Sequence, residues 1–88
     1  MYTITYHKKV VKNDIPKLDT KARNSIKKAI ETKLIETPEK YTEGLRNTLS
    51  GNRKLRVGNY RVVFKIMRKE VKILIIAHRS KVYEIVRE

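Results

Sequence analysis

Three cations at fixed spacing, Lys54, Arg56 and Arg61, are the residues of this sequence best placed to do chemistry. They alternate with apolar residues on either side of Gly58-Asn59, a dipeptide typical of a tight β-hairpin turn. Such a turn fixes the register, and a slip of one residue would bury all three cations, so we expect them on one surface patch. The bland alternative is an ordinary solvated strand face, because exposed Lys and Arg are common.

The alternation over residues 53–66 also predicts which side of this hairpin is buried. Apolar residues fill one parity on both strands: Leu55, Val57, Tyr60, Val62, Phe64 and Ile66. Arg61, Val63 and Lys65 have the opposite parity, and we expect them on the solvent side with the other cations. The hairpin should therefore pack one face into a core and present a basic face to a partner.

The composition indicates what that partner is. The 88 residues include 22 Lys+Arg and only 9 Asp+Glu, which gives a formal net charge of +13. So large an excess repels itself unless an anion is close, and nucleic acid phosphates or an acidic protein would both supply one. An anionic membrane surface is a weaker third option, since no single segment combines a broad apolar face with an unbroken basic one.

Other classes of protein are excluded or disfavoured by what the sequence lacks. There are no cysteines, and the two histidines alone make a structural zinc site improbable, so we expect neither a disulfide framework nor a metal. No apolar run is long enough to span a bilayer, and no leader precedes the first strand, so we expect a cytoplasmic protein. The length fits one domain over residues 1–88.

The N-terminal half is predicted to form one strand and a helical hairpin. Residues 2–6 alternate as in a strand, and residues 8–15 have helical spacing that Pro16 should end. Asp19 or Thr20 is expected to cap a longer helix that runs to about Glu36. The apolar stripe of this hairpin must be covered, so it should pack across one face of the sheet.

The C-terminal half is predicted to complete an antiparallel meander. Thr37-Pro38 should begin a helical turn through about Tyr41, followed by a loop over residues 43–52. After the hairpin, a polar turn at 68–70 leads to an apolar strand at 71–77, which should lie inside the sheet beside the first strand. A short helix over 81–88 should pack back through Val82, Ile85 and Val86. The expected fold class is α+β, with the helices on an antiparallel sheet.

This order of elements resembles the RelE/ParE superfamily of bacterial and archaeal toxins, over the whole chain. Three stretches carry the resemblance: Leu49-Ser-Gly51, the run from Lys54 to Phe64, and His78-Arg79-Ser-Lys-Val-Tyr83. RelE-like members are endoribonucleases that enter the ribosomal A site and cut messenger RNA, whereas ParE-like members inhibit DNA gyrase. Both kinds are held inactive by a cognate antitoxin, so the resemblance implies an acidic, RelB-like partner.

The RelE-like chemistry suits the residues present. Metal-independent RNA cleavage needs activation of the 2′-hydroxyl, stabilisation of a doubly negative phosphorane and charge or a proton for the leaving 5′-oxygen. With no carboxylate cluster for Mg²⁺ and no cofactor expected, this work falls on Lys, Arg and Tyr. By resemblance Arg61 binds the scissile phosphate, Lys54 and Arg56 support it, and Tyr83 stacks on a base or accepts a proton. The other residues implied are Arg79 and His78 in catalysis, and Arg53, Lys65 and Lys81 in RNA binding.

Several of these roles have alternatives. His78 is a possible general acid, with an ordinary pKa near ~6.5, or a strand-end residue bonded to a backbone carbonyl. Arg79 could pair with Glu84 or a helix end, and Tyr83 could simply cover the core. The chain also departs from well-studied members, which carry a lysine at the position of Asn52 and an arginine at that of Ala77.

Two functions are therefore expected to compete. The first is a ribosome-dependent messenger RNA endoribonuclease that inhibits translation. The second is a ParE-like gyrase inhibitor or a non-catalytic module whose cations only hold an acidic antitoxin. The Arg79-x-x-x-Tyr83 ending favours the nuclease, because ParE-like chains usually end without it.

Overall fold

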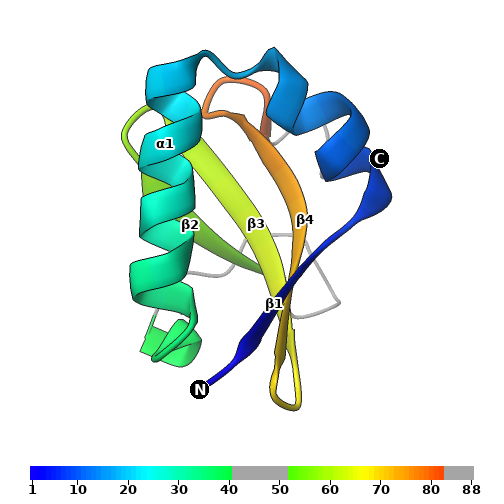
Figure 1. The fold of residues 1–88 in the computed structure, drawn as a ribbon, viewed down its shortest axis with the longest axis vertical. Helices are drawn as coiled ribbons and strands as arrows, with labels where there is room; N and C mark the ends of the chain where they lie inside the picture. Colours follow the sequence, from blue (N-terminus) through cyan, green and yellow to red (C-terminus); the bar gives the residue numbers. More distant parts are fainter. Residues whose placement is uncertain (41–51, 83–88) are drawn as a thin grey trace.

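A computed structural model describes residues 1–40 and 52–82 of the chain. Its centre is a four-stranded sheet with the strand order β1-β4-β3-β2, and its helical segments pack against one face of that sheet (Figure 1). The strands are β1 (Thr3–Tyr6), β2 (Arg53–Val57), β3 (Tyr60–Met67) and β4 (Glu70–His78). The α+β class is therefore confirmed.

The three C-terminal strands form the predicted antiparallel meander. Gly58 has φ +58°, in the left-handed region that glycine enters freely, so the Gly58-Asn59 turn closes as the sequence indicates. The second turn is shorter than expected, because Glu70 already belongs to β4 and pairs with Met67. Arg68 supplies the positive φ of that turn, also at 58°.

The first strand makes the sheet mixed, where a wholly antiparallel sheet was expected. β1 pairs with β4, as predicted, but runs parallel to it, with Ile4 opposite Val71 and Tyr6 opposite Ile73. Because β1 is joined to the meander through the helical segments and not by a hairpin, no short turn forces it to be antiparallel. The interior position of β4 is confirmed.

The helical layer begins directly after β1. Lys8 and Lys9 lead into a π-helical turn, η1 (Val10–Asp14), and a 3-10 turn, η2 (Ile15–Lys17), that ends one residue after Pro16. The capped helix is α1 (Thr20–Ala29), continued by a π-helical turn η3 (Ile30–Leu34), and a last 3-10 turn is η4 (Pro38–Lys40).

Asp19 is the N-cap of α1, as predicted. Its carboxylate Oδ1 accepts a hydrogen bond from the Ala22 N–H at 2.7 Å. The α-helix itself is shorter than the expected run to Glu36. The Thr32 hydroxyl donates to the Lys28 carbonyl at 2.8 Å, and such a bond competes with the regular backbone ladder where the helix widens.

The main core lies between the sheet and the helical layer. It joins Ile26, Ile30 and Leu34 to the predicted buried row of the hairpin, centred on Phe64, which is completely buried. The first helical segment is tied to β4 by a polar bond as well, because the Ile76 N–H donates to Asp14 Oδ2 at 2.9 Å. Asp14 thereby satisfies an edge of β4 that lies beyond the four-residue reach of β1.

The opposite face of the sheet carries a second, smaller apolar cluster. Val63 was expected on the solvent side, but it is completely buried there with Val82, and Leu74, Ile75 and Ala77 pack around them. Val82 belongs to the segment that returns after β4, which explains why alternation within the hairpin alone could not reveal this cover. The expected loop at 43–52 and the final helix at 81–88 fall almost wholly outside the described residues.

None of the helices in residues 1–40 and 52–82 is long and apolar enough to cross a membrane.

Candidate functional site

The strand register brings the predicted cations together on the sheet face opposite the helical layer. Arg56 lies directly opposite Arg61 in the β2–β3 pair, and Lys54 lies one same-face position further along, opposite Val63. Lys65 continues the same parity along β3 and faces Lys72 of β4. We call these five residues the basic face; the predicted convergence of Lys54, Arg56 and Arg61 is observed.

Two pairs of like charges therefore stand directly opposite each other, Arg56 with Arg61 and Lys65 with Lys72. Cross-strand pairs of like charge destabilise a sheet, so folding alone does not account for this arrangement. No group of His, Cys, Asp and Glu within the described residues is arranged to hold a metal ion. The basic face is therefore suited to an anionic partner, with its charge supplied by Lys and Arg.

The Arg61 side chain is held at the base of the hairpin turn. Its Nη1 donates to the Gly58 carbonyl at 3.0 Å and to the Tyr60 carbonyl at 2.8 Å. These bonds use one nitrogen of a guanidinium that carries five N–H donors, so donors remain for a ligand. The turn thus orients Arg61, whereas Arg56 opposite it is exposed.

Lys54 differs from the expectation, because only 8% of it is exposed. Its register partner is Val63, at the centre of the second apolar cluster, and that cluster forms a layer which the hairpin pattern did not predict. Lys54 is therefore a largely buried cation beside an open one, Arg56. A cation in such surroundings exerts a stronger field on a bound phosphate than one in bulk water.

His78 lies on the other side of the sheet from Arg61. Leu74 is an extra residue in β4, since Val63 faces Ile75 while Phe64 faces Ile73, so the alternation along β4 shifts there. Simple alternation from Val71 would place His78 with the cations; after the bulge it faces Tyr60. The two rings meet edge to face, with centroids 5.7 Å apart.

The segment after β4 returns to the basic face. The Arg79 N–H donates to the Asn59 carbonyl at 2.8 Å, which ties this segment to the hairpin turn next to Arg61. Three residues later, Val82 is buried beside Val63. Tyr83 follows immediately in the sequence but lies outside the described residues.

The predicted RNA-binding residues are divided between the two sides. Arg56 and Lys65 lie on the basic face, but Arg53 has the parity of Leu55 and pairs with Phe64 on the helix side. Lys81 is exposed and lines a cavity that includes His78. Sequence reasoning missed Lys72, although counting across the two-residue turn after Met67 places it opposite Lys65.

The sequence as a whole matches a known family. The model for the "ParE toxin of type II toxin-antitoxin system, parDE" matches residues 4–83. The chain belongs to this toxin family. The expected RelE/ParE superfamily is thereby confirmed, although no curated protein sequence is a significant match to the chain.

Solved structures of RelE toxins share the fold of this family member. The toxin of the intact Escherichia coli RelBE complex is 23% identical, with a TM-score of 0.72, covering 89% of this chain and 96% of that one. The RelE of a Methanococcus jannaschii RelB–RelE complex is 20% identical, with a TM-score of 0.67, covering 92% and 96%. The archaeal RelE of Pyrococcus horikoshii OT3, solved with RelB, is 25% identical, with a TM-score of 0.64, covering 91% and 97%.

Proposed function

We propose that this toxin is a ribosome-dependent, metal-independent endoribonuclease that cuts messenger RNA and so inhibits translation. The observation that carries the proposal is the basic face, where the register sets Arg56 opposite Arg61 and Lys54 beside them, at a cost to the sheet. Functional sites are where sequences break a rule of stability without local compensation.

In the proposed reaction the RNA 2′-oxygen attacks the adjacent phosphorus, and the bond from phosphorus to the 5′-oxygen breaks. Arg61, already oriented by the Gly58 and Tyr60 carbonyls, binds the non-bridging oxygens and stabilises the phosphorane. Arg56 and Lys54 add positive charge from the neighbouring strand. We assign Arg79 to the same phosphate, since its backbone is bonded to the hairpin turn.

Tyr83 is proposed as the group that stacks on a base or accepts the 2′-hydroxyl proton. The chain reaches the basic face at Val82, one residue earlier, which supports this placement. His78 is less well placed as a general acid, because it faces Tyr60 on the helix side of the sheet. With so few proton carriers, alignment of the RNA has to come from a larger body, which is why we assign the ribosome as the site of action.

An acidic antitoxin is the proposed regulator. Structures of RelE with RelB from E. coli, M. jannaschii and P. horikoshii show such pairs for proteins of this fold. A net charge of +13 favours a partner of opposite sign. A negatively charged segment over Arg56 and Arg61 would block RNA and relieve their mutual repulsion.

A second candidate function is inhibition of DNA gyrase. It is favoured by one observation, that the matching family model is that of ParE toxins. In that case the basic face would bind a protein or DNA without cleaving RNA.

One parallel experiment separates the two candidates. A defined message is translated in a cell-free system with purified toxin, and the 5′ ends of the RNA are mapped; plasmid supercoiling by gyrase is measured with the same preparation. We expect new 5′ ends within translated codons only when ribosomes are present, and no loss of supercoiling. Intact message together with lost supercoiling would establish the gyrase candidate instead.

A further inference from the structure

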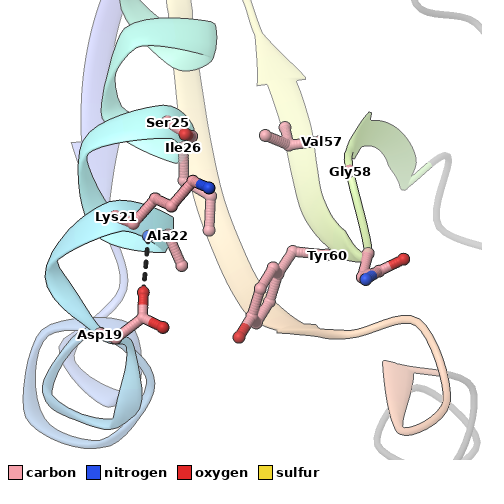
Figure 2. A pocket seen from close by; sticks show the side chains of 9 residues that line it. Asp19, Lys21, Ala22, Ser25, Ile26, Val57, Gly58 and Tyr60 are labelled. Carbon is pink, nitrogen blue, oxygen red and sulfur yellow. Dashed lines mark hydrogen bonds between the residues drawn. The ribbon is translucent and has the colours of Figure 1, made fainter.

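A second group of cations lies at the tip of the β2–β3 hairpin, on the helix side of the sheet. Two cavities adjoin there and share Tyr60 as a common wall. One, of about 350 Å³, opens between the start of α1 and the Gly58-Asn59 turn, and Lys21 and Ser25 line it (Figure 2). The other, of about 330 Å³, is lined by residues that include Asp14, Lys17, His78 and Lys81. The proposed cleavage mechanism uses neither cavity.

Tyr60 offers an aromatic surface to both cavities. It is half-buried, and its side chain extends from the hairpin across the gap towards Asp19 (Figure 2). Among the described residues nothing hydrogen-bonds its hydroxyl, although a tyrosine hydroxyl in a partly closed site usually finds a partner. His78 packs edge to face against the ring and so forms part of the same wall.

The His78 ring is set to donate. Its Nδ1 accepts a hydrogen bond from the Ser80 N–H at 3.2 Å and lies 2.8 Å from the Ser80 hydroxyl. An Nδ1 that accepts carries no proton, so the proton of the neutral ring is on Nε2, which becomes a donor. The walls thus supply donors from His78 and the lysines, and acceptors from Asp19 and Ser25.

The lysines of these cavities are free to bind an anion. In the part of the chain that the structure describes, Lys17, Lys21 and Lys81 form no ion pair. The two carboxylates nearby are already engaged with backbone, Asp14 with the Ile76 N–H and Asp19 with the Ala22 N–H. Three ammonium groups therefore surround one aromatic ring.

We infer that this tip is a second RNA-binding site, which takes an unpaired nucleotide with its base against Tyr60 and its phosphates at Lys17, Lys81 and Lys21. An aromatic surface flanked by cations is how proteins hold single-stranded nucleic acid, and mixed donors and acceptors match the edge of a base. The inference rests on the proposed function for its choice of RNA over an acidic peptide. It extends that function, because Arg61 and Tyr60 are adjacent on opposite sides of the hairpin, so one strand can pass around the turn.

The test measures binding without cleavage. A fluorescent 12-nucleotide single-stranded RNA with 2′-O-methyl sugars is titrated with the whole chain, by anisotropy, at several salt concentrations. Lys17→Gln/Lys81→Gln removes two cations of the tip; Lys28→Gln/Lys40→Gln removes two exposed cations elsewhere and is the matched control. We expect the tip variant to bind at least about fivefold more weakly and its salt slope to fall by about 1.4, at ~0.7 per phosphate, with the control within about twofold of wild type.

A cross-link locates the base. The same RNA carrying 5-iodouridine is irradiated with the protein, and the modified peptide is identified by mass spectrometry; we expect the adduct on Tyr60, and again on the ring in Tyr60→Phe. Equal losses of affinity in the tip and control variants, or adducts only elsewhere, would overturn the inference. A tip variant that binds RNA normally but loses a 12-residue poly-glutamate peptide would overturn it too, and assign the cavities to an acidic protein.

The result is separable from that for the cleavage site. Arg61→Ala should retain the Tyr60 adduct while losing message cleavage. If wild-type protein forms the adduct but cuts no message, the proposed nuclease fails and the RNA-binding tip stands. If message is cut but neither the adduct nor the affinity difference is seen, the nuclease stands and the tip site fails.

Discussion

The pairing of Arg56 with Arg61 is the clearest sign that single residues of this protein are placed for function. Both belong to the hairpin that forms the centre of the sheet, and their register is fixed by a turn that glycine makes possible. A fold selected for stability alone would put opposite charges or β-branched residues there. The proteins of this family that use the face for an anion gain from the repulsion, since a bound phosphate relieves it.

This gives a prediction for Arg56→Gln. The change removes one member of the like-charged pair from an exposed position, so the free energy of unfolding should stay constant or rise by about 0.2–1 kcal/mol. Message cleavage should fall at the same time, because positive charge near the phosphate is lost. Chemical denaturation and cleavage in a cell-free system measure the two effects. A variant that is less stable by more than about 1 kcal/mol would mean that Arg56 has a structural partner, and the reasoning from repulsion would be wrong.

Lys54 and His78 show why residue roles were harder to predict than residue positions. The alternation around Gly58-Asn59 correctly placed Lys54 with Arg56 and Arg61, because it depends only on neighbouring residues. Its burial depends on the Val63–Val82 cluster, which brings together segments far apart in the sequence. The side taken by His78 depends on one extra residue, Leu74, and an apolar run gives no local sign of a bulge.

At the scale of elements, short polar contacts decide how the helical layer meets the sheet. The capping of α1 by Asp19 was predictable, since a cap involves residues three apart. The bond from the Ile76 N–H to Asp14 was not, because it joins residues 62 positions apart. It replaces a sheet partner where β1 has ended, and so it continues the edge of β4 by other means.

We therefore predict that Asp14→Ala destabilises the protein more than its partial exposure suggests. It leaves the Ile76 N–H without its acceptor, which should lower the free energy of unfolding by about 1–3 kcal/mol. Asp19→Ala is the comparison, with an expected loss of about 0.5–2 kcal/mol from the missing cap. Urea denaturation of both variants measures the difference, and Asp14→Asn, which keeps an oxygen acceptor, should recover part of the loss. An Asp14→Ala variant as stable as wild type would show that water replaces the carboxylate.

At the scale of the whole molecule, charge dominates. Repulsion among 22 Lys and Arg against 9 Asp and Glu opposes the compact state, and that repulsion is screened as ionic strength rises. The family of toxins to which the chain belongs is defined by a partner, and the surplus charge is consistent with a protein whose stable form in the cell is a complex.

The corresponding prediction is that salt stabilises the free toxin. Raising NaCl from about 20 mM to 500 mM shortens the Debye length from roughly 20 Å to about 4 Å, so the Tm should increase. Lys28→Gln/Lys40→Gln, with two fewer charges, should start from a higher Tm and gain less. Calorimetric or dichroism melts give these values. A Tm that falls with NaCl would mean that attractive ion pairs outweigh the net repulsion.

The central claim is that Arg61 stabilises the transition state of RNA cleavage on a face whose other side is the core. The most direct test is the rate at which Arg61→Ala cuts a message positioned on a programmed ribosome, measured in a single turnover beside wild type, with a melt of each protein. Removing such a group typically lowers the rate by ~10² to 10³, while the loss of two bonds to exposed turn carbonyls should cost no more than about 1 kcal/mol of stability. We predict a cleavage rate reduced at least a hundredfold in a protein that melts within a few degrees of wild type. A normally folded Arg61→Ala that cleaves the message at the wild-type rate would contradict the account.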